Sequence, residues 1–181
     1  MTNPVQQRLT VSTRECGATF SPCRKYRYAL WREWDASKPA VVFCGLNPST
    51  ADETEDDATI RVELGYARRW GFGRLVMVNA YGYCSTDPRA LWGVDDPRGP
   101  DNFLAIKVHC FEASKREGGM FVAVWGNNIR ESDALELRRV LRFEGVKVHA
   151  LKLTKRGQPH HPLRLPKTLQ PFEWPAPGGG V

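Results

Sequence analysis

The chain has 181 residues and a formal net charge of +6, and 41% of its residues are hydrophobic while 25% are charged. This length suits one sizeable hydrophobic core. No apolar run approaches the roughly 20 residues of a membrane span, which excludes an integral membrane protein of helical type. The N-terminus lacks the basic start and apolar stretch of a secretory signal. We therefore expect a cytoplasmic protein without a membrane partner.

The cysteines indicate a reducing compartment. There are five of them, an odd number, and they are spread over the chain, which argues against a disulfide framework. The four histidines do not fall at zinc-ligand spacings relative to these cysteines. We expect neither a metal nor a cofactor.

Strand-like and helix-like stretches alternate along the chain. Residues 26–34 alternate apolar and basic side chains, which predicts a strand or hairpin at a sheet edge. Three continuous apolar runs are typical of strands buried on both faces, and a fourth, looser run follows them. The four runs are residues 40–44, 75–79, 121–125 and 146–153. Helix-like stretches occupy residues 57–70, 102–117 and 132–143, with Ser132 as a candidate N-cap and Gly145 as a stop signal.

This order predicts a three-layer α/β/α domain. Its centre would be a four-stranded, mainly parallel sheet, with the N-terminal strand or hairpin on the edge. We expect a single domain over residues 1–170, made of an N-terminal extension (1–38) and a core (40–166). Residues 171–181, PFEWPAPGGGV, are expected to be a flexible C-terminal tail. The oligomeric state is left open, with a monomer favoured.

The residues that follow the predicted strands should converge, because ligands of open α/β sheets bind beyond the carboxyl ends of the strands. The set is rich in amides and contains neither a Ser-His-Asp triad nor a phosphate-binding glycine loop. Each member also has a purely structural interpretation. Asn47 and Pro48 are turn formers, and Asn79 can simply cap a strand end.

The acids after the first strand also allow two interpretations. Asp52, Asp56 and Asp57 include a candidate N-cap for the helix that starts near Thr59, where carboxylates are favourable. The alternative is a catalytic carboxylate, for which Asp52 is the first candidate. Basic residues dominate later, since residues 138–167 contain nine of them and one acid. That stretch predicts either a solvated face or a phosphate-binding one.

Four short motifs in order resemble the uracil-DNA glycosylase superfamily. They are G-L-N-P-S at 45–49, G-R-L-V-M-V-N at 73–79, F-V-A-V-W-G at 121–126 and H-P-L at 161–163, and together they span residues 40–166. The asparagine of the first motif is similar to that of the mismatch-specific branch, with its G-x-N-P motif. The segments L-N-P-S-T-A-D (46–52) and P-H-H-P-L (159–163) further resemble the domain of unknown function 1643 family.

The glycosylase resemblance implies a set of roles. Asn47 would position a water and His161 would donate to the departing base. An asparagine cannot itself be a general base, so Asp52 is added as the third catalytic candidate. The implied base-binding residues are Gly45, Leu46, Asn79, Tyr81 and Phe43, with Asn79 reading the base edge and one aromatic ring stacking on it. The implied DNA-binding residues are Ser49, Lys155, Arg156, Leu163, Arg164 and Lys167.

The leading functional hypothesis is a hydrolase that cleaves the N-glycosidic bond of a base extruded from DNA, modified bases included. Two alternatives stay open at this point. One is a non-catalytic module that binds a base or DNA on the same fold, and the other is an enzyme acting on free nucleosides or nucleotides. The partner expected in the first two cases is DNA, duplex or single-stranded.

Overall fold

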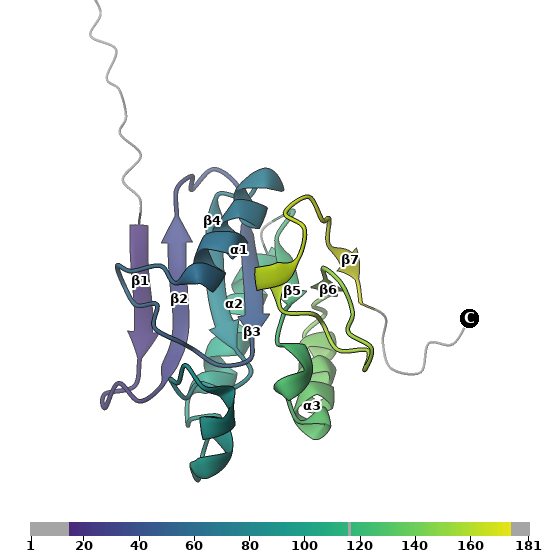
Figure 1. Cartoon of the computed structure of the whole chain (residues 1–181). Helices are drawn as coiled ribbons and strands as arrows, with labels where there is room; N and C mark the ends of the chain where they lie inside the picture. The colour runs from purple at the N-terminus through teal and green to yellow at the C-terminus, as the bar shows by residue number, and fades with distance from the viewer. Residues whose placement is uncertain (1–14, 116, 175–181) are drawn as a thin grey trace, which may run out of the picture.

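A seven-stranded sheet forms the centre of the computed structural model, which describes residues 15–115 and 117–174 (Figure 1). The strand order is β1-β2-β4-β3-β5-β6-β7. The strands are β1 Glu15–Phe20, β2 Arg27–Glu33, β3 Ala40–Gly45, β4 Arg74–Asn79, β5 Met120–Ala123, β6 Val148–Ala150 and β7 Phe172–Glu173.

The sheet is mixed. Strands β4, β3, β5 and β6 correspond to the four predicted runs and pair in parallel. The β1–β2 hairpin joins β4 in antiparallel orientation at one side, and β7 joins β6 in antiparallel orientation at the other. The four predicted parallel strands are thus part of a larger, mixed sheet. The β1–β2 hairpin agrees with the strand or hairpin predicted for one edge, whereas β7, of only two residues, falls in the predicted tail.

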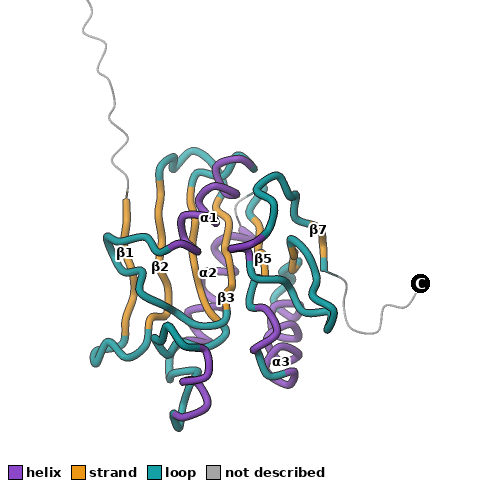
Figure 2. The backbone as a smooth tube through the Cα atoms, in the orientation of Figure 1, coloured by secondary structure: helices purple, strands orange, loops and turns teal. Residues whose placement is uncertain are grey.

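Helices cover both faces of the sheet (Figure 2). They are α1 Ala58–Arg69, α2 Asn102–Lys115 and α3 Glu131–Phe143, with short 3-10 helices η1 Pro88–Gly93, η2 Gly126–Asn128 and η3 Pro162–Arg164. Helix α1 packs against one face, where Ile60 and Leu64 meet Val41 and Phe43. Helices α2 and α3 pack on the other face together with Val42 and Cys44. Successive residues of β3 thus enter different cores, which explains its continuous apolar run.

Helix boundaries follow local chemistry. Asp57 is the N-cap of α1 and accepts a hydrogen bond from the Ile60 amide at 2.9 Å, which confirms that the acidic group contains a helix cap. The prediction of Ser132 as an N-cap was wrong, because α3 begins at Glu131 with Arg130 at the cap position and no side-chain cap. Gly145 follows the end of α3 with φ of 74°, as expected for a glycine stop.

Part of the predicted C-terminal tail is structured. Phe172 and Glu173 form β7, and Trp174 is only 8% exposed, with its ring 5.7 Å from that of Trp125. Residues 171–174 are therefore ordered, because the tryptophan buries a large apolar area. The remaining part of the predicted tail, 175–181, lies outside the described residues, as do residues 1–14 of the predicted extension.

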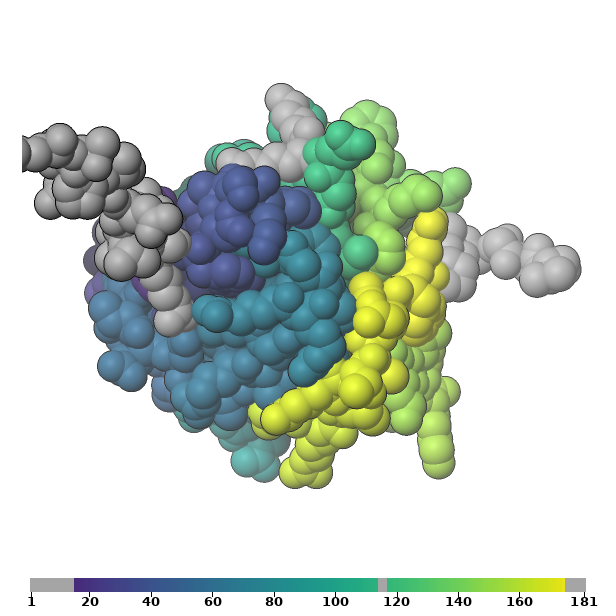
Figure 3. All heavy atoms as spheres, turned by 90° about the horizontal axis from the view of Figure 1, so that it is seen from above, coloured from purple at the N-terminus to yellow at the C-terminus, as the bar shows by residue number. Residues whose placement is uncertain are grey.

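The last described segment, residues 152–174, runs across the surface beside α1 (Figure 3). Two hydrogen bonds fix it there. Tyr66 Oη donates to the Pro166 carbonyl at 2.8 Å, and Trp70 Nε1 donates to the Leu169 carbonyl at 3.1 Å. Within the two described ranges, no helix is both long and apolar enough to cross a membrane.

Buried arginines of β2 hold the connection between β3 and α1. Arg32 is fully buried, and its guanidinium donates to the Asp56 carboxylate and to the Asp52 carbonyl, each at 2.8 Å. Arg27 is 2% exposed and donates to the Ala51 carbonyl. The segment 46–57, which contains the first predicted motif, is thereby attached to the sheet.

Replacing Arg32 by methionine is expected to lower the free energy of unfolding by about 3 kcal/mol, because it leaves Asp56 and buried carbonyls without their donor. The matched control is Arg24→Met. Arg24 pairs with Glu53 of the same segment at 2.9 Å, but with side chains 58% and 40% exposed, so its loss should cost less than about 1 kcal/mol. Urea unfolding of the three proteins measures both values, and equal losses would contradict the assignment.

Candidate functional site

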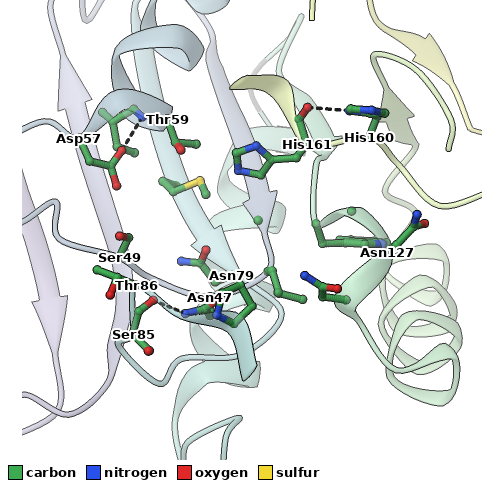
Figure 4. A pocket seen from close by; sticks show the side chains of 18 of the residues that line it. Asn47, Ser49, Asp57, Thr59, Asn79, Ser85, Thr86, Asn127, His160 and His161 are labelled. Carbon is green, nitrogen blue, oxygen red and sulfur yellow. Dashed lines mark hydrogen bonds between the residues drawn. The ribbon is translucent and has the colours of Figure 1, made fainter. Parts of the chain in front are cut away.

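A pocket of about 470 Å³ opens at the carboxyl ends of β3, β4 and β5 (Figure 4). This is the edge of the sheet at which the sequence predicts a ligand. Its volume lies within the usual range for a small-molecule site. The residues that line it are Arg27, Gly45, Leu46, Asn47, Ser49, Asp57, Thr59, Ile60, Met77, Asn79, Ser85, Thr86, Pro88, Trp125, Gly126, Asn127, Asn128, Thr154, His160 and His161.

The structure brings six of the predicted site residues together in this pocket. They are Gly45, Leu46, Asn47, Ser49, Asn79 and His161. Figure 4 shows Asn47 and Asn79 close together on one side of the pocket, with the ring of His161 pointing in from another side. The neighbouring His160 points away and has its Nδ1 2.8 Å from the His161 carbonyl.

Asn79 is fully buried, yet neither polar atom of its side-chain amide has a hydrogen-bond partner. Burying an amide without partners costs free energy, and such groups are rare in folded proteins. Gly45 allows this placement, since a methyl group at position 45 would lie only 2.9 Å from Asn79 Oδ1. The Asn79 amide therefore offers one donor and one acceptor to a ligand in the pocket.

Asn47 is held rigidly by the chain that follows β4. Its Nδ2 donates to the Ser85 carbonyl at 2.8 Å and to the Pro48 carbonyl at 3.0 Å. These two acceptors assign the orientation of the amide, because only the nitrogen can donate. The Oδ1 atom is left to accept a hydrogen bond from a water or a ligand.

His161 presents a hydrogen-bond donor to the pocket. Its Nδ1 accepts from the Leu163 amide at 3.4 Å, which leaves the proton of the neutral ring on Nε2. Desolvation by the pocket walls, together with the nearby His160, lowers the pKa of the His161 imidazole. The neutral form is thus favoured near pH 7.

Asp57, not Asp52, is the carboxylate that lines the pocket. The Asp52 carboxylate instead accepts from the Thr54 and Glu55 amides at 2.8 Å each, and these hydrogen bonds lower its pKa. Asp52 is therefore a turn residue outside the pocket, which corrects its place in the predicted catalytic set. Asp57 was recognised as a cap, but a cap and a pocket carboxylate give the same sequence pattern.

Neither aromatic residue predicted to stack on a base lies in the pocket. Phe43 is fully buried against Trp70, with ring centroids 5.9 Å apart. Tyr81 is 1% exposed and donates to the Asp133 carboxylate, and burial together with this acid raises its pKa. As a correction, both side chains belong to the cores and are not placed to stack on a ligand here.

None of the predicted DNA-binding residues of the C-terminal half lines the pocket. Residues 154–161 form part of its wall, where Thr154 Oγ1 donates to Asn127 Oδ1 at 2.7 Å. The side chains of Lys155, Arg156, Leu163, Arg164 and Lys167 are exposed on this segment and on the chain that follows it. Their contact with DNA stays a prediction.

Arg27 is the main residue that the sequence interpretation missed. It lines the pocket although it is 2% exposed, and its Nε has no hydrogen-bond partner. Burial lowers the pKa of its guanidinium. In the sequence it is one of several basic residues in an alternating strand, and no pattern distinguishes it from Arg32. Among the described residues, no cluster of three or more His, Cys, Asp or Glu is arranged to hold a metal ion.

Replacing Asn79 by leucine is expected to raise the free energy of unfolding by about 1 kcal/mol, because an unpaired buried amide is exchanged for an apolar group of similar size. Asn102→Leu is the control. Asn102 is equally buried, but its Nδ2 donates to the Asn79 carbonyl at 2.9 Å, so its loss should lower the free energy by about 2 kcal/mol. Urea unfolding tests both, and destabilisation by Asn79→Leu would show that its amide serves the fold.

Comparison with known proteins identifies a family. A search among curated proteins and one among solved structures found no match. A family model described as "Protein of unknown function (DUF1643)" matches residues 27–163, a segment that begins at Arg27 of the pocket and ends just beyond His161. Since this segment is well over half of the 181 residues, the chain belongs to the DUF1643 family.

Proposed function

We propose that this protein binds a nucleobase in the pocket and hydrolyses its N-glycosidic bond, as a glycosylase-like hydrolase. The observation that carries the proposal is the unpaired amide of Asn79, which offers a donor and an acceptor side by side in a pocket of suitable size. A nucleobase edge carries the complementary pair. The resemblance of the four motifs to the uracil-DNA glycosylase superfamily supports the same assignment.

The departing base would be stabilised by His161. Cleavage of an N-glycosidic bond places negative charge on the base, and a donor aimed at that charge lowers the barrier. The Nε2 proton of neutral His161 supplies such a donor, because its Nδ1 already accepts from the Leu163 amide. Because the imidazole is neutral, it keeps its Nε2 proton, and the donor is in place before negative charge develops on the base.

Two residues that line the pocket, Asn47 and Asp57, are the candidates to act on the attacking water. Asn47 Oδ1 can accept a hydrogen bond from the water, but an amide has no useful basicity near neutral pH. Asp57 can supply the base. One of its oxygens caps α1 by accepting from the Ile60 amide, which leaves the second oxygen for the water.

DNA is the first substrate to test. Lys155 and Arg156 are exposed on segment 154–161, which forms part of the pocket wall, and Arg164 and Lys167 are exposed farther along the chain. All four can neutralise backbone phosphates. Leu163 is 44% exposed on η3 and has the apolar character of a side chain that wedges between bases. A free nucleotide is the second candidate, and it is favoured by the buried cation of Arg27.

Asp57→Asn is expected to lower the rate of base release by about a hundredfold or more, because the general base is lost while asparagine still caps the helix. Asp52→Asn is the matched control, and its rate should stay within about threefold of the unchanged protein. The polymeric substrates are oligonucleotides with uracil, hypoxanthine, mismatched or modified bases, and alkali treatment reveals their abasic sites. The free substrates are nucleosides and nucleotides, and chromatography detects the base that they release.

The two variants also decide between the carboxylates. If Asp52→Asn abolishes base release and Asp57→Asn does not, the assignment from the pocket geometry fails. Absence of base release from every polymeric and free substrate would remove the hydrolase and leave at most a base-binding module.

A further inference from the structure

The guanidinium of Arg27 is a buried cation without an ion pair. It is 2% exposed, and among residues 15–115 and 117–174 no carboxylate lies within 4.0 Å of it. Its one hydrogen bond runs to the Ala51 carbonyl, and its Nε has no partner. An arginine stays charged in proteins. Buried charges are ordinarily paired, so an unpaired one at a pocket is a candidate contact for an anion.

Two acids act on Arg27 from a distance, and neither replaces a bound anion. Glu63 on α1 is fully buried with both oxygens unpaired, and burial raises its pKa well above the usual value, which favours its uncharged form. Asp57 lies farther from Arg27 than an ion pair allows, and one of its oxygens is engaged with the helix cap. The positive charge at this end of the pocket is therefore only partly offset.

Hydroxyl groups accompany this cation. Ser49 follows β3 and Thr86 precedes η1, and Figure 4 shows them side by side at one end of the pocket. Within the described chain, neither hydroxyl makes a hydrogen bond, so both can donate to a ligand. Arg27 contacts the same segment as Ser49, through Ala51. Guanidinium and hydroxyl donors together are the usual set for a phosphate group.

We infer that the pocket takes a nucleoside monophosphate, with its base at Asn79 and His161 and its phosphate at Arg27, Ser49 and Thr86. The base half of this inference rests on the proposed function, whereas the phosphate half rests on the buried cation and the two hydroxyl groups. A terminal phosphate fits better than an internal phosphodiester. At an internal phosphodiester the nucleic-acid strand continues in two directions, and both would have to leave a site whose arginine is almost entirely covered by protein.

Isothermal titration calorimetry tests the inference with four kinds of probe. These are nucleosides, their 5′- and 3′-monophosphates, ribose 5-phosphate, and single-stranded oligonucleotides that contain the same bases. At least one monophosphate should bind about tenfold or more tightly than its nucleoside. Equal affinities, or an oligonucleotide that binds more tightly than every monophosphate, would overturn the inference and leave the proposed hydrolase on DNA intact.

Variants then locate the phosphate contact. Arg27→Met should remove the preference for the monophosphate over the nucleoside. Arg32→Met is the matched control, because Arg32 is also buried in β2 and holds the same segment but does not line the pocket. It should retain the preference. A preference that survives Arg27→Met, or that disappears in both variants, would contradict a phosphate contact at Arg27.

A second variant covers the case in which Arg27→Met does not fold. Ser49→Ala combined with Thr86→Val leaves the Arg27 contact with Ala51 in place and should reduce the preference at least threefold, whereas no reduction would contradict the subsite. Ribose 5-phosphate separates the two proposals. If it binds in an Arg27-dependent manner while no nucleoside binds, the anion site stands and the nucleobase hydrolase falls.

Discussion

The attachment of the β3–α1 connection to β2 is the constraint on which the pocket depends. Arg27 and Arg32 reach from β2 to the carbonyls of Ala51 and Asp52, and Arg32 also pairs with Asp56. Buried charges of this kind are costly unless every hydrogen bond is made, so they favour one conformation of the segment strongly over others. That conformation carries Asn47 into the pocket at one end and starts α1 at the other.

The pocket contains buried polar groups whose hydrogen bonds are incomplete. Arg32 has its guanidinium fully engaged, whereas Arg27 holds the Ala51 carbonyl but has an unpaired Nε. Asn102 uses its amide nitrogen on two carbonyls and leaves only Oδ1 unpaired, whereas Asn79, equally buried, uses neither polar atom. In each of these pairs the residue with more unpaired polar atoms is the one that lines the pocket. Such local conflicts with the rules of stability are expected where a protein binds a ligand.

The sequence predicts much of the fold because hydrophobic periodicity records burial directly. The four parallel strands and the three helices lie where their patterns place them, and membership of the DUF1643 family follows from short motifs such as L-N-P-S-T-A-D. A strand or hairpin was predicted for the edge that β1 and β2 occupy, but β7 was not predicted, since a strand of two residues leaves little sequence pattern. The position of Trp174 depends on its contact with Trp125, which is far away in the sequence. The residues around Trp174 do not predict such a contact.

The sequence predicts which residues share the pocket where their position in the backbone decides this. It does not do so where the direction of the side chain decides. Gly45, Asn47 and Asn79 sit at strand ends, and parallel pairing of β3 with β4 brings such ends together. Tyr81 lies only two residues beyond Asn79, yet it turns into the core toward Asp133. Asp52 and Asp57 are equally acidic in the sequence. Because Arg32 holds the carbonyl of residue 52 and the Asp52 carboxylate caps its own turn, the segment delivers Asp57 to the pocket instead. A carboxylate that caps a helix is also fixed in direction, so the residue with the most evident structural role is the one that presents a carboxylate to the pocket.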